Sequence, residues 1–293
     1  MVPVYSHSRI STFENCPRQF YYRYVEKRPV ETEGIEAFVG KRVHEVLERL
    51  NRFVERGQVP SLGKVIARFR ALWDETFQPE RVRIVRAENP PESYRESGER
   101  CLTNHYRRHY PFDRDESLGI EQHVSFSLDA EGRYRMQGII DRIARAPDGA
   151  VEIHDYKTGR WVPTQQALDQ DRQLALYQIG LAARYGDTPM RLVWHYLLRD
   201  QTRVSTRTPE QLDELRAATA TRIDQIEAEQ SFDPRPSNLC GWCEFRDVCP
   251  AVTGTEPEPL AADAAPAATA PRAGVRPAAT DAPARPADQL RLL

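Results

Sequence analysis

The sequence predicts one α/β domain, in which a β-sheet is decorated with helices. Apolar and β-branched runs bounded by turn signals predict strands at residues 120–128, 134–144, 150–156 and 190–198. Helical periodicity occupies much of the sequence around these runs. With 293 residues, of which 40% are hydrophobic and 29% charged, the chain can bury a full core in one elaborated domain.

The predicted helices are amphipathic segments on both sides of these strands. We expect them at residues 8–25, 39–54, 62–77, 92–110, 172–185 and 209–229. The first four precede the sheet and would form a helical half over it. In the second helix, His44 lies at the border of the apolar stripe, where a histidine is more often a packing residue than a ligand.

The stretch GIIDRIARAPDGAVEIHDYKTG places charges in two runs that otherwise have the pattern of buried strands. Because alternate side chains of a strand share a face, we expect Ile139, Asp141 and Ile143 on one face of the first strand. By the same rule, Asp155 and Lys157 continue an apolar row of the second strand. The Pro-Asp-Gly sequence between the runs predicts a hairpin, which would bring Asp141 near Asp155.

Two carboxylates and a lysine would therefore meet at one edge of the core. A buried charge is costly unless it is paired or bound to a metal, and carboxylate oxygens are the ligands that Mg²⁺ prefers. The alternative is an ordinary ion pair between Asp155 and Lys157 on a solvated face, which would contribute little. Motifs elsewhere in the sequence favour the metal site.

Five motifs, in order over residues 5–250, resemble the PD-(D/E)XK nuclease superfamily in the branch of the RecB nuclease domain. They are the start YSHSRISTFENCPRQFYYRYV, the helix GKRVHEVLERL, Asp141 followed by DYKTG, the helix QLALY, and the cysteine-rich end CGWCEFRDVCP. This branch is related to the AddB nuclease domain and the CRISPR-adaptation nuclease. The resemblance implies a restriction-endonuclease-like core, with a mixed central sheet flanked by helices, in a nuclease domain over residues 1–250.

The resemblance also implies a set of metal ligands. They would be His44, Asp141, Asp155 and the backbone carbonyl of Tyr156, and the ion would be Mg²⁺ or Mn²⁺. Hydrolysis of a phosphodiester requires an activated water and stabilisation of the charge that develops on phosphorus, and one or two divalent ions can provide both. Ile140 stands where the superfamily name has proline, a departure that is common in this branch.

The catalytic residues implied by the resemblance are Lys157, Gln173 and Tyr177, together with Asp141 and Asp155. Lys157 would position the attacking water or neutralise the transition state. Gln173 and Tyr177 are four residues apart on a predicted helix, so their side chains share a face. In the family they orient the lysine and the DNA strand.

The five cysteines give a second signal. Cys240, Cys243 and Cys249 form C-x2-C-x5-C near the end of the domain, and Cys16 lies far upstream beside a proline. This arrangement resembles the iron-sulfur site of the same nuclease branch, so we expect a structural [4Fe-4S] cluster that joins the two ends of the domain, with zinc as the alternative. Cys101 is left over and is expected to pack in the core.

Composition favours a cytoplasmic enzyme. The sequence has no run of eighteen apolar residues to span a membrane and no signal-peptide pattern at MVPVYSHSR, which argues against disulfides. The net charge of −2 does not indicate binding to nucleic acid by bulk charge. Residues 81–86 and 105–110 mix cations with aromatic or apolar residues and could form a local DNA groove or an ordinary solvated helix face.

After residue 250 the composition changes to Ala, Pro and Thr, which predicts a disordered tail over residues 251–293. Its last five residues, QLRLL, resemble the peptide by which bacterial proteins bind the sliding clamp. The alternative is an ordinary chain end. The residues that would contact the clamp are Gln289, Leu290, Leu292 and Leu293.

The leading functional prediction is a divalent-metal-dependent DNA nuclease of repair or recombination, an exonuclease that prefers single strands. Residues 34–41 have five residues rather than four between their glycines, so they are not a phosphate-binding loop, and a helicase partner would be a separate chain. One alternative is a CRISPR-adaptation nuclease. Another is a non-catalytic iron-sulfur subunit that binds DNA in a helicase-nuclease complex, which is disfavoured because competent side chains occupy every catalytic position.

Overall fold

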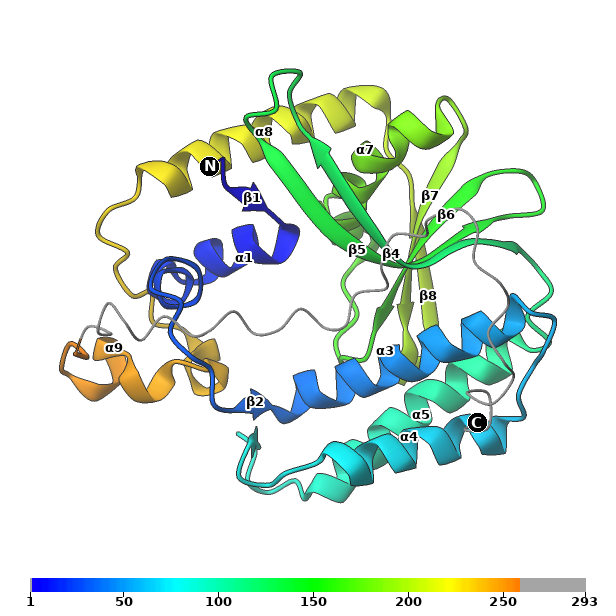
Figure 1. Cartoon of the computed structure of the whole chain (residues 1–293), viewed down its shortest axis with the longest axis horizontal. Helices are drawn as coiled ribbons and strands as arrows, with labels where there is room; N and C mark the ends of the chain where they lie inside the picture. Colours follow the sequence, from blue (N-terminus) through cyan, green and yellow to red (C-terminus); the bar gives the residue numbers. More distant parts are fainter. Residues whose placement is uncertain (1, 259–293) are drawn as a thin grey trace, which may run out of the picture.

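The computed structural model describes residues 2–258, and at its centre is a six-stranded mixed sheet (Figure 1). The strands pair in the order β1-β5-β6-β7-β8, and β4 pairs with β5. The pairs β1/β5 and β6/β7 are parallel and the others are antiparallel. The strands are β1 (Val4–Tyr5), β4 (Glu116–Ser127), β5 (Arg135–Arg145), β6 (Val151–Lys157), β7 (Met190–Tyr196) and β8 (Gln201–Ser205).

Strand β5 creates an opening in this sheet. One of its edges pairs with β4 along its length, while the other pairs with β1 at Arg135 and Met136 and with β6 only from Arg142 onward. Within the described chain, residues 137–141 have no strand partner on that second edge. The opening between β1 and β6 is where the candidate site lies.

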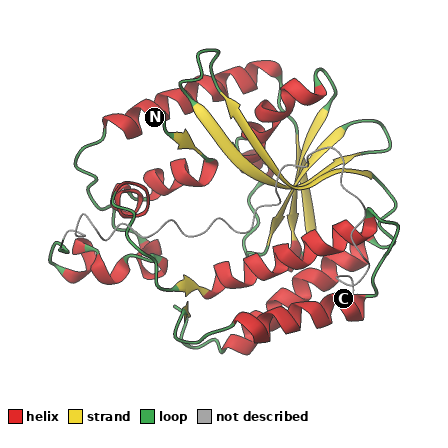
Figure 2. Ribbon diagram, in the orientation of Figure 1, coloured by secondary structure: helices red, strands yellow, loops and turns green. Residues whose placement is uncertain are grey.

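Helices cover both faces of the sheet (Figure 2). The helices α3 (Ile35–Val54), α4 (Leu62–Thr76) and α5 (Pro91–His109) share one apolar core with Tyr156 of β6. On the other face, α7 (Gln173–Tyr185) packs on β5, β6 and β7, with α6 (Gln165–Asp169) at its start. A third apolar cluster joins α7 to α8 (Pro209–Ala228) and to the N-terminal segment. The predicted α/β class with a mixed central sheet is confirmed.

The N-terminal helix predicted at residues 8–25 is wrong as one continuous element. The chain forms α1 (His7–Asn15), α2 (Pro17–Phe20) and a π-helical turn, η1 (Tyr21–Val25). Cys16 separates the first two because its backbone is extended, with φ of −159°. Pro17 then begins α2, where its missing N–H costs nothing.

The predicted alternation of Ile139, Asp141 and Ile143 on one face is also wrong. Ile139 is 44% exposed, whereas Ile140 and Ile143 both lie in the core against α7. Opposite this part of β5, Glu121 of β4 has a φ of 48°, in the left-handed region. That conformation interrupts an extended strand, so the simple alternation does not continue through Asp141.

Other elements lie close to the prediction, with a few additions. The predicted strand at 190–198 ends at Tyr196 and continues as a short turn of 3₁₀ helix. Several short elements were not predicted, because their few residues carry no periodicity. They are β1, β2 (Glu33–Gly34), β3 (Val82–Arg83), α6, η2 (Leu197–Arg199), β8, η3 (Asn238–Trp242), η4 (Arg246–Val248) and α9 (Pro250–Thr253).

The C-terminal part of the described chain returns to the N-terminal segment. Arg18 pairs with Glu256 at 3.2 Å, and Gln19 donates to Glu244 at 2.9 Å. The expected domain end at residue 250 falls on the first residue of α9. Most of the expected tail, including the clamp peptide, lies outside the described residues. Within residues 2–258, no helix is both long and apolar enough to cross a membrane.

Candidate active site

The candidate site lies where β5 and β6 separate. The last paired residues of the two strands are Arg142 and His154, so Asp141 and Asp155 follow the end of the ladder. Asp141 bridges the opening, because its Oδ2 accepts a hydrogen bond from the backbone N–H of Tyr156 at 2.7 Å. The hairpin therefore brings together the two strand segments that carry the predicted carboxylates.

Helix α3 brings His44 to the same point. Its Nδ1 lies 3.3 Å from Oδ1 of Asp141, and its Nε2 donates to the backbone carbonyl of Tyr156 at 2.8 Å. Burial opposes protonation of His44, but the hydrogen bond and charge of Asp141 outweigh it and raise the pKa of His44 to about 9. Protonated His44 therefore lies between two oxygen groups, the Asp141 carboxylate and the Tyr156 carbonyl. Both of these groups are of a kind that can bind a divalent ion.

Asp155 is the most buried carboxylate of the site, with 6% of its surface exposed. Its Oδ1 accepts hydrogen bonds from Lys157 Nζ and from the Gln173 amide, each at 3.0 Å. Burial raises the pKa of Asp155, and the Lys157 charge opposes that shift. For Lys157, burial would lower the pKa, but the charge of Asp155 outweighs it and raises the pKa, so the lysine stays protonated.

The donor set suits a hard divalent ion. Oδ2 of Asp155 is buried and makes no hydrogen bond within the described chain, although Lys157 Nζ is 2.8 Å away. Donor atoms of His44, Asp141 and Glu121 lie within 4.8 Å of one another. Carboxylate, imidazole and carbonyl donors of this kind fit Mg²⁺ or Mn²⁺.

Glu121 is the residue that sequence reasoning missed. It lies in β4, beside Asp141 in the neighbouring strand, and its positive φ departs from an extended strand. Glutamate rarely adopts this conformation, and strained backbone often occurs at functional sites. No local motif marks Glu121, since its nearness to His44 and Asp141 depends on the register between β4 and β5.

Gln173 and Tyr177 lie on the face of α7 that points into the opening. Gln173 accepts a hydrogen bond from Lys157 Nζ at 2.9 Å and so joins the lysine to Asp155. Tyr177 packs against Gly138 so closely that a Cβ on this glycine would be 2.3 Å from the ring. Burial raises the pKa of Tyr177 to about 12, so its phenol stays protonated near neutral pH.

A cavity of about 560 Å³ opens beside these residues. Polar side chains from β4, β5 and the N-terminal segment line much of it, and Ile139 and Tyr177 add apolar surface. Its size and mixed surface suit an extended polar ligand with flat apolar parts. Its polar lining residues include Ser6, His7, Ser8, His123, Gln137 and Gln173.

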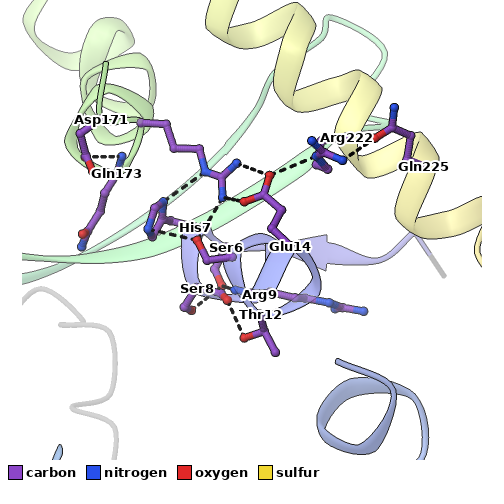
Figure 3. Close-up of polar contacts among 12 residues, drawn as sticks. Ser6, His7, Ser8, Arg9, Thr12, Glu14, Asp171, Gln173, Arg222 and Gln225 are labelled. Atoms are coloured by element: carbon purple, nitrogen blue, oxygen red, sulfur yellow. Dashed lines mark hydrogen bonds and ion pairs between the residues drawn. The ribbon is translucent and has the colours of Figure 1, made fainter. Parts of the chain in front are cut away.

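An ionic network holds the N-terminal segment against this cavity (Figure 3). Glu14 of α1 pairs with Arg172 at the start of α7 and with Arg222 of α8. His7 borders the cavity close to Gln173, and burial lowers its pKa to about 4. The network therefore holds α1, α7 and α8 together around Gln173, the residue that contacts Lys157.

The four predicted cluster cysteines surround a second cavity, of about 350 Å³. Backbone N–H groups of Arg235 and Ser237 donate to the sulfur atoms of Cys16 and Cys240, at 3.4 and 3.2 Å. Burial raises the pKa of Cys243 to about 11, so a metal would be needed to hold its thiolate at neutral pH.

The spacing of the described cysteines bears on the size of the group that they could hold. Among the described residues, no set of three potential metal ligands within 4.8 Å of one another includes a cysteine. A zinc ion with Zn–S bonds of about 2.3 Å would hold sulfur atoms closer than that. Cys101 is apart from the cavity and buried in the core of α3, α4 and α5, as expected.

Together the fold and the site define the class of protein. A mixed sheet carries two carboxylates and a lysine at a hairpin opening, with a histidine and a glutamine from helices on opposite faces, an arrangement suited to metal-dependent phosphodiester hydrolysis. The family model of the PD-(D/E)XK nuclease superfamily matches residues 4–250. The chain belongs to this superfamily of metal-dependent nucleases.

Two further comparisons add little. A search among curated proteins finds no significant match. Among solved structures, one titled "Crystal structure of SSO0001" has 15% sequence identity, covering 84% of this chain and 95% of the other, with a TM-score of 0.35. A similarity of this size carries no conclusion about the site.

Proposed function

We propose that the protein is a divalent-metal-dependent deoxyribonuclease of DNA repair or recombination, acting as an exonuclease that prefers single strands. The observation that carries this proposal is the gathering of donor atoms at the strand opening, where Asp141 accepts from the backbone of Tyr156 and donor atoms of His44, Asp141 and Glu121 lie within 4.8 Å of one another. Carboxylate and imidazole donors gathered in this way suit a divalent cation, whose charge would offset that of the carboxylates.

In this proposal, His44, Asp141, Asp155 and the carbonyl of Tyr156 hold Mg²⁺ or Mn²⁺. When bound, the ion supplies an activated water and a positive charge beside the phosphate. Lys157 is already protonated and directed by Asp155 and Gln173, so it can donate to the phosphate oxygens as negative charge develops.

The cavity beside the site supports a single-stranded substrate. Ile139, which is 44% exposed, offers apolar surface to unpaired bases beside the largely buried Tyr177, and the polar groups of Ser6, Ser8 and Gln137 can contact the backbone. Exonuclease action and the repair role rest on the resemblance to the RecB branch. DNA is thus the proposed substrate, and a helicase on a separate chain is a proposed partner.

The test is cleavage of end-labelled linear DNA and of circular DNA, each single- and double-stranded, with Mg²⁺ or Mn²⁺. We expect the wild type to degrade linear single strands and spare circles. Lys157→Ala should lose cleavage by about 10²-fold or more, because a charge that stabilises the transition state is removed. The matched control is Lys64→Ala, which removes an exposed lysine of α4 and should cleave normally.

Three outcomes would contradict the proposal. Cleavage of circles would overturn the exonuclease assignment, and undiminished cleavage by Lys157→Ala would overturn the assigned active site. No cleavage by the metal-loaded, folded wild type would favour the alternative of a non-catalytic DNA-binding subunit.

We further propose that Cys16, Cys240, Cys243 and Cys249 bind a structural [4Fe-4S] cluster, with zinc as the alternative. The size of their cavity and the two N–H···S contacts support the cluster. Anaerobically purified wild type should be brown, and Cys243→Ser should lose both the visible absorbance and several degrees of melting temperature. Cys101→Ser is the control and should keep the absorbance, and colourless, zinc-containing wild type would overturn the cluster.

The last part of the proposal concerns the C-terminal peptide, which lies beyond the described residues. We propose that Gln289, Leu290, Leu292 and Leu293 bind a bacterial sliding clamp, so that the tail acts as a tether. Binding of a peptide of the last ten residues to a clamp should be lost in Gln289→Ala. Absence of binding at high micromolar concentration would refute it.

A further inference from the structure

Four buried or half-buried histidines gather on the face of the sheet that α5 covers. This histidine cluster consists of His105 and His109 of α5, His154 of β6 and His195 of β7. The sequence allows residues 105–110 to form part of a DNA groove or a solvated helix face, but His105 points inward and is 5% exposed. The proposed nuclease chemistry uses none of the four, so their burial needs a separate explanation.

Three of these histidines present nitrogen atoms to one point. His105 and His109 are four residues apart, so they share a face of α5, and His195 faces them from the sheet. One ligand atom from each lies within 4.8 Å of the others. A zinc ion with Zn–N bonds of about 2.0–2.1 Å would hold such atoms about 3.3 Å apart, a change that modest ring rotations can produce.

Two of the nitrogen atoms lack a partner. Nδ1 of His105 and Nε2 of His109 are buried and make no hydrogen bond within residues 2–258. Buried polar atoms of native proteins nearly always have a partner, which can be an ion or a water molecule. Here the two atoms belong to side chains of the same helix face, so one bound species could satisfy both.

His195 has the hydrogen bonding of a metal ligand. Its Nε2 lies 2.9 Å from Nδ1 of His154, and Nε2 of His154 lies 3.5 Å from the Glu152 carboxylate. If His195 ligates through Nδ1, the ion replaces a 3.5 Å contact of that atom with Thr202 Oγ1, and the Nε2–H of His195 donates to His154. Nε2 of His154 makes no hydrogen bond within residues 2–258, but it lies on the side of the Glu152 carboxylate. A hydrogen bond from the ring N–H that does not bind the metal orients an imidazole ligand and raises its basicity.

Charge and space also suit an ion. Burial lowers the pKa of every histidine in the cluster, that of His109 to about 4, so the imidazoles are neutral at pH 7 as ligands must be. Two cations whose charges act on the cluster, Arg142 and Arg108, are paired with Asp115 and Asp200. A cavity of about 10 Å³ between the three histidines and Thr202 has room for one small species.

We propose that His105, His109 and His195 bind one transition-metal ion, with zinc the first candidate, at a site separate from the nuclease centre. Three imidazole nitrogens favour zinc or its neighbours over Mg²⁺, which prefers oxygen. The ion joins the end of α5 to β7 and lies behind Tyr156, whose ring contacts His105. It would therefore stiffen the strand that carries Asp155 without contacting DNA.

The test is a zinc count on the full-length protein. Wild type, His109→Gln, His109→Cys and His123→Gln are stripped with chelator, loaded with zinc, desalted and analysed for bound metal. We expect His109→Gln to retain one equivalent less than wild type and to bind that ion at least about 100-fold more weakly. His109→Cys keeps a zinc-binding side chain and should retain the ion, and His123→Gln, at an exposed histidine of β4, is the matched control.

The differential count separates this site from the cysteine cavity and the nuclease centre, because the His109 variants change a residue that belongs to neither. Equal zinc in folded wild type and His109→Gln would overturn the proposal and favour a buried water as the bridging species. If His109→Gln does not fold, X-ray absorption of the zinc-loaded wild type decides. Nitrogen neighbours at about 2.0–2.1 Å support the site, and sulfur neighbours alone at about 2.3 Å overturn it.

Discussion

The replacement Lys157→Met tests the electrostatic design of the candidate site. Lys157 is the close positive partner of Asp155, at 2.8 and 3.0 Å from its two oxygens, and Asp141 adds a second negative charge nearby. Methionine keeps most of the side-chain volume but removes the charge. Asp155 would then be a buried carboxylate stabilised by the Gln173 amide and by the charge of His44, without its close cation.

The expected loss of stability can be worked from these contacts. Removing one partner of a buried ion pair costs about 3–5 kcal/mol, but the Lys157 side chain is 37% exposed, so we expect about 2–3 kcal/mol without metal. Mn²⁺ should restore most of the loss, because a bound cation replaces the missing charge. The metal-restored variant should still fail to cleave DNA.

Urea unfolding at pH 8 in EDTA and then in Mn²⁺ measures both effects. The same replacement in an Asp155→Asn background should cost less than about 0.5 kcal/mol, since the carboxylate charge is already gone. Lys64→Met controls for loss of a lysine. Equal stability of Lys157→Met and wild type in EDTA, or an unchanged cost in the Asp155→Asn background, would refute the reasoning.

Three further predictions concern packing and pH. Gly98→Ala should destabilise the protein by about 1–3 kcal/mol, because its Cβ would be 2.3 Å from the Phe69 ring, whereas Gly63→Ala, which meets nothing, should be neutral or stabilising in urea unfolding. Gly138→Ala should displace Tyr177 and lower cleavage by about 10-fold or more, while metal binding, measured by calorimetry, stays unchanged. Burial lowers the pKa values of the histidine cluster in the folded protein. In EDTA and below pH 6.5, the unfolded chain therefore binds more protons at these histidines than the folded chain does. Each histidine that stays neutral should then reduce the unfolding free energy by about 1.4 kcal/mol per pH unit towards pH 4, and equal urea midpoints at pH 7.5 and 5.5 would contradict this.

The parts of the site that the sequence could predict are those encoded by local pattern. Asp155 and Lys157 are marked by their place in an apolar strand, and the Pro-Asp-Gly turn is enough to fold Asp141 back towards them. His44 and Gln173 follow from helical periodicity combined with the motif resemblance. These inferences need only neighbouring residues or a known order of motifs.

The remaining features depend on contacts between distant segments. Glu121 reaches Asp141 only through the register of β4 on β5, and its left-handed backbone follows no glycine or turn signal. The histidine cluster requires α5 to lie over β7, which no periodicity specifies. The break at Cys16, in contrast, follows a local signal, because the residue before a proline is biased away from the helical region.

The contact between the two ends of the described chain sets an order for biosynthesis. Residues 16–28 pack against residues 235–258, through contacts such as Tyr22 to Val248 and Arg28 to Glu258. A ribosome adds about 5–20 residues per second, so the N-terminal segment waits on the order of 10–50 s for its partners. The strands that carry Asp141 and Asp155 are made well before then. The nascent chain can therefore assemble the strands of its candidate site while the aromatic side chains of the N-terminal segment are still exposed to solvent.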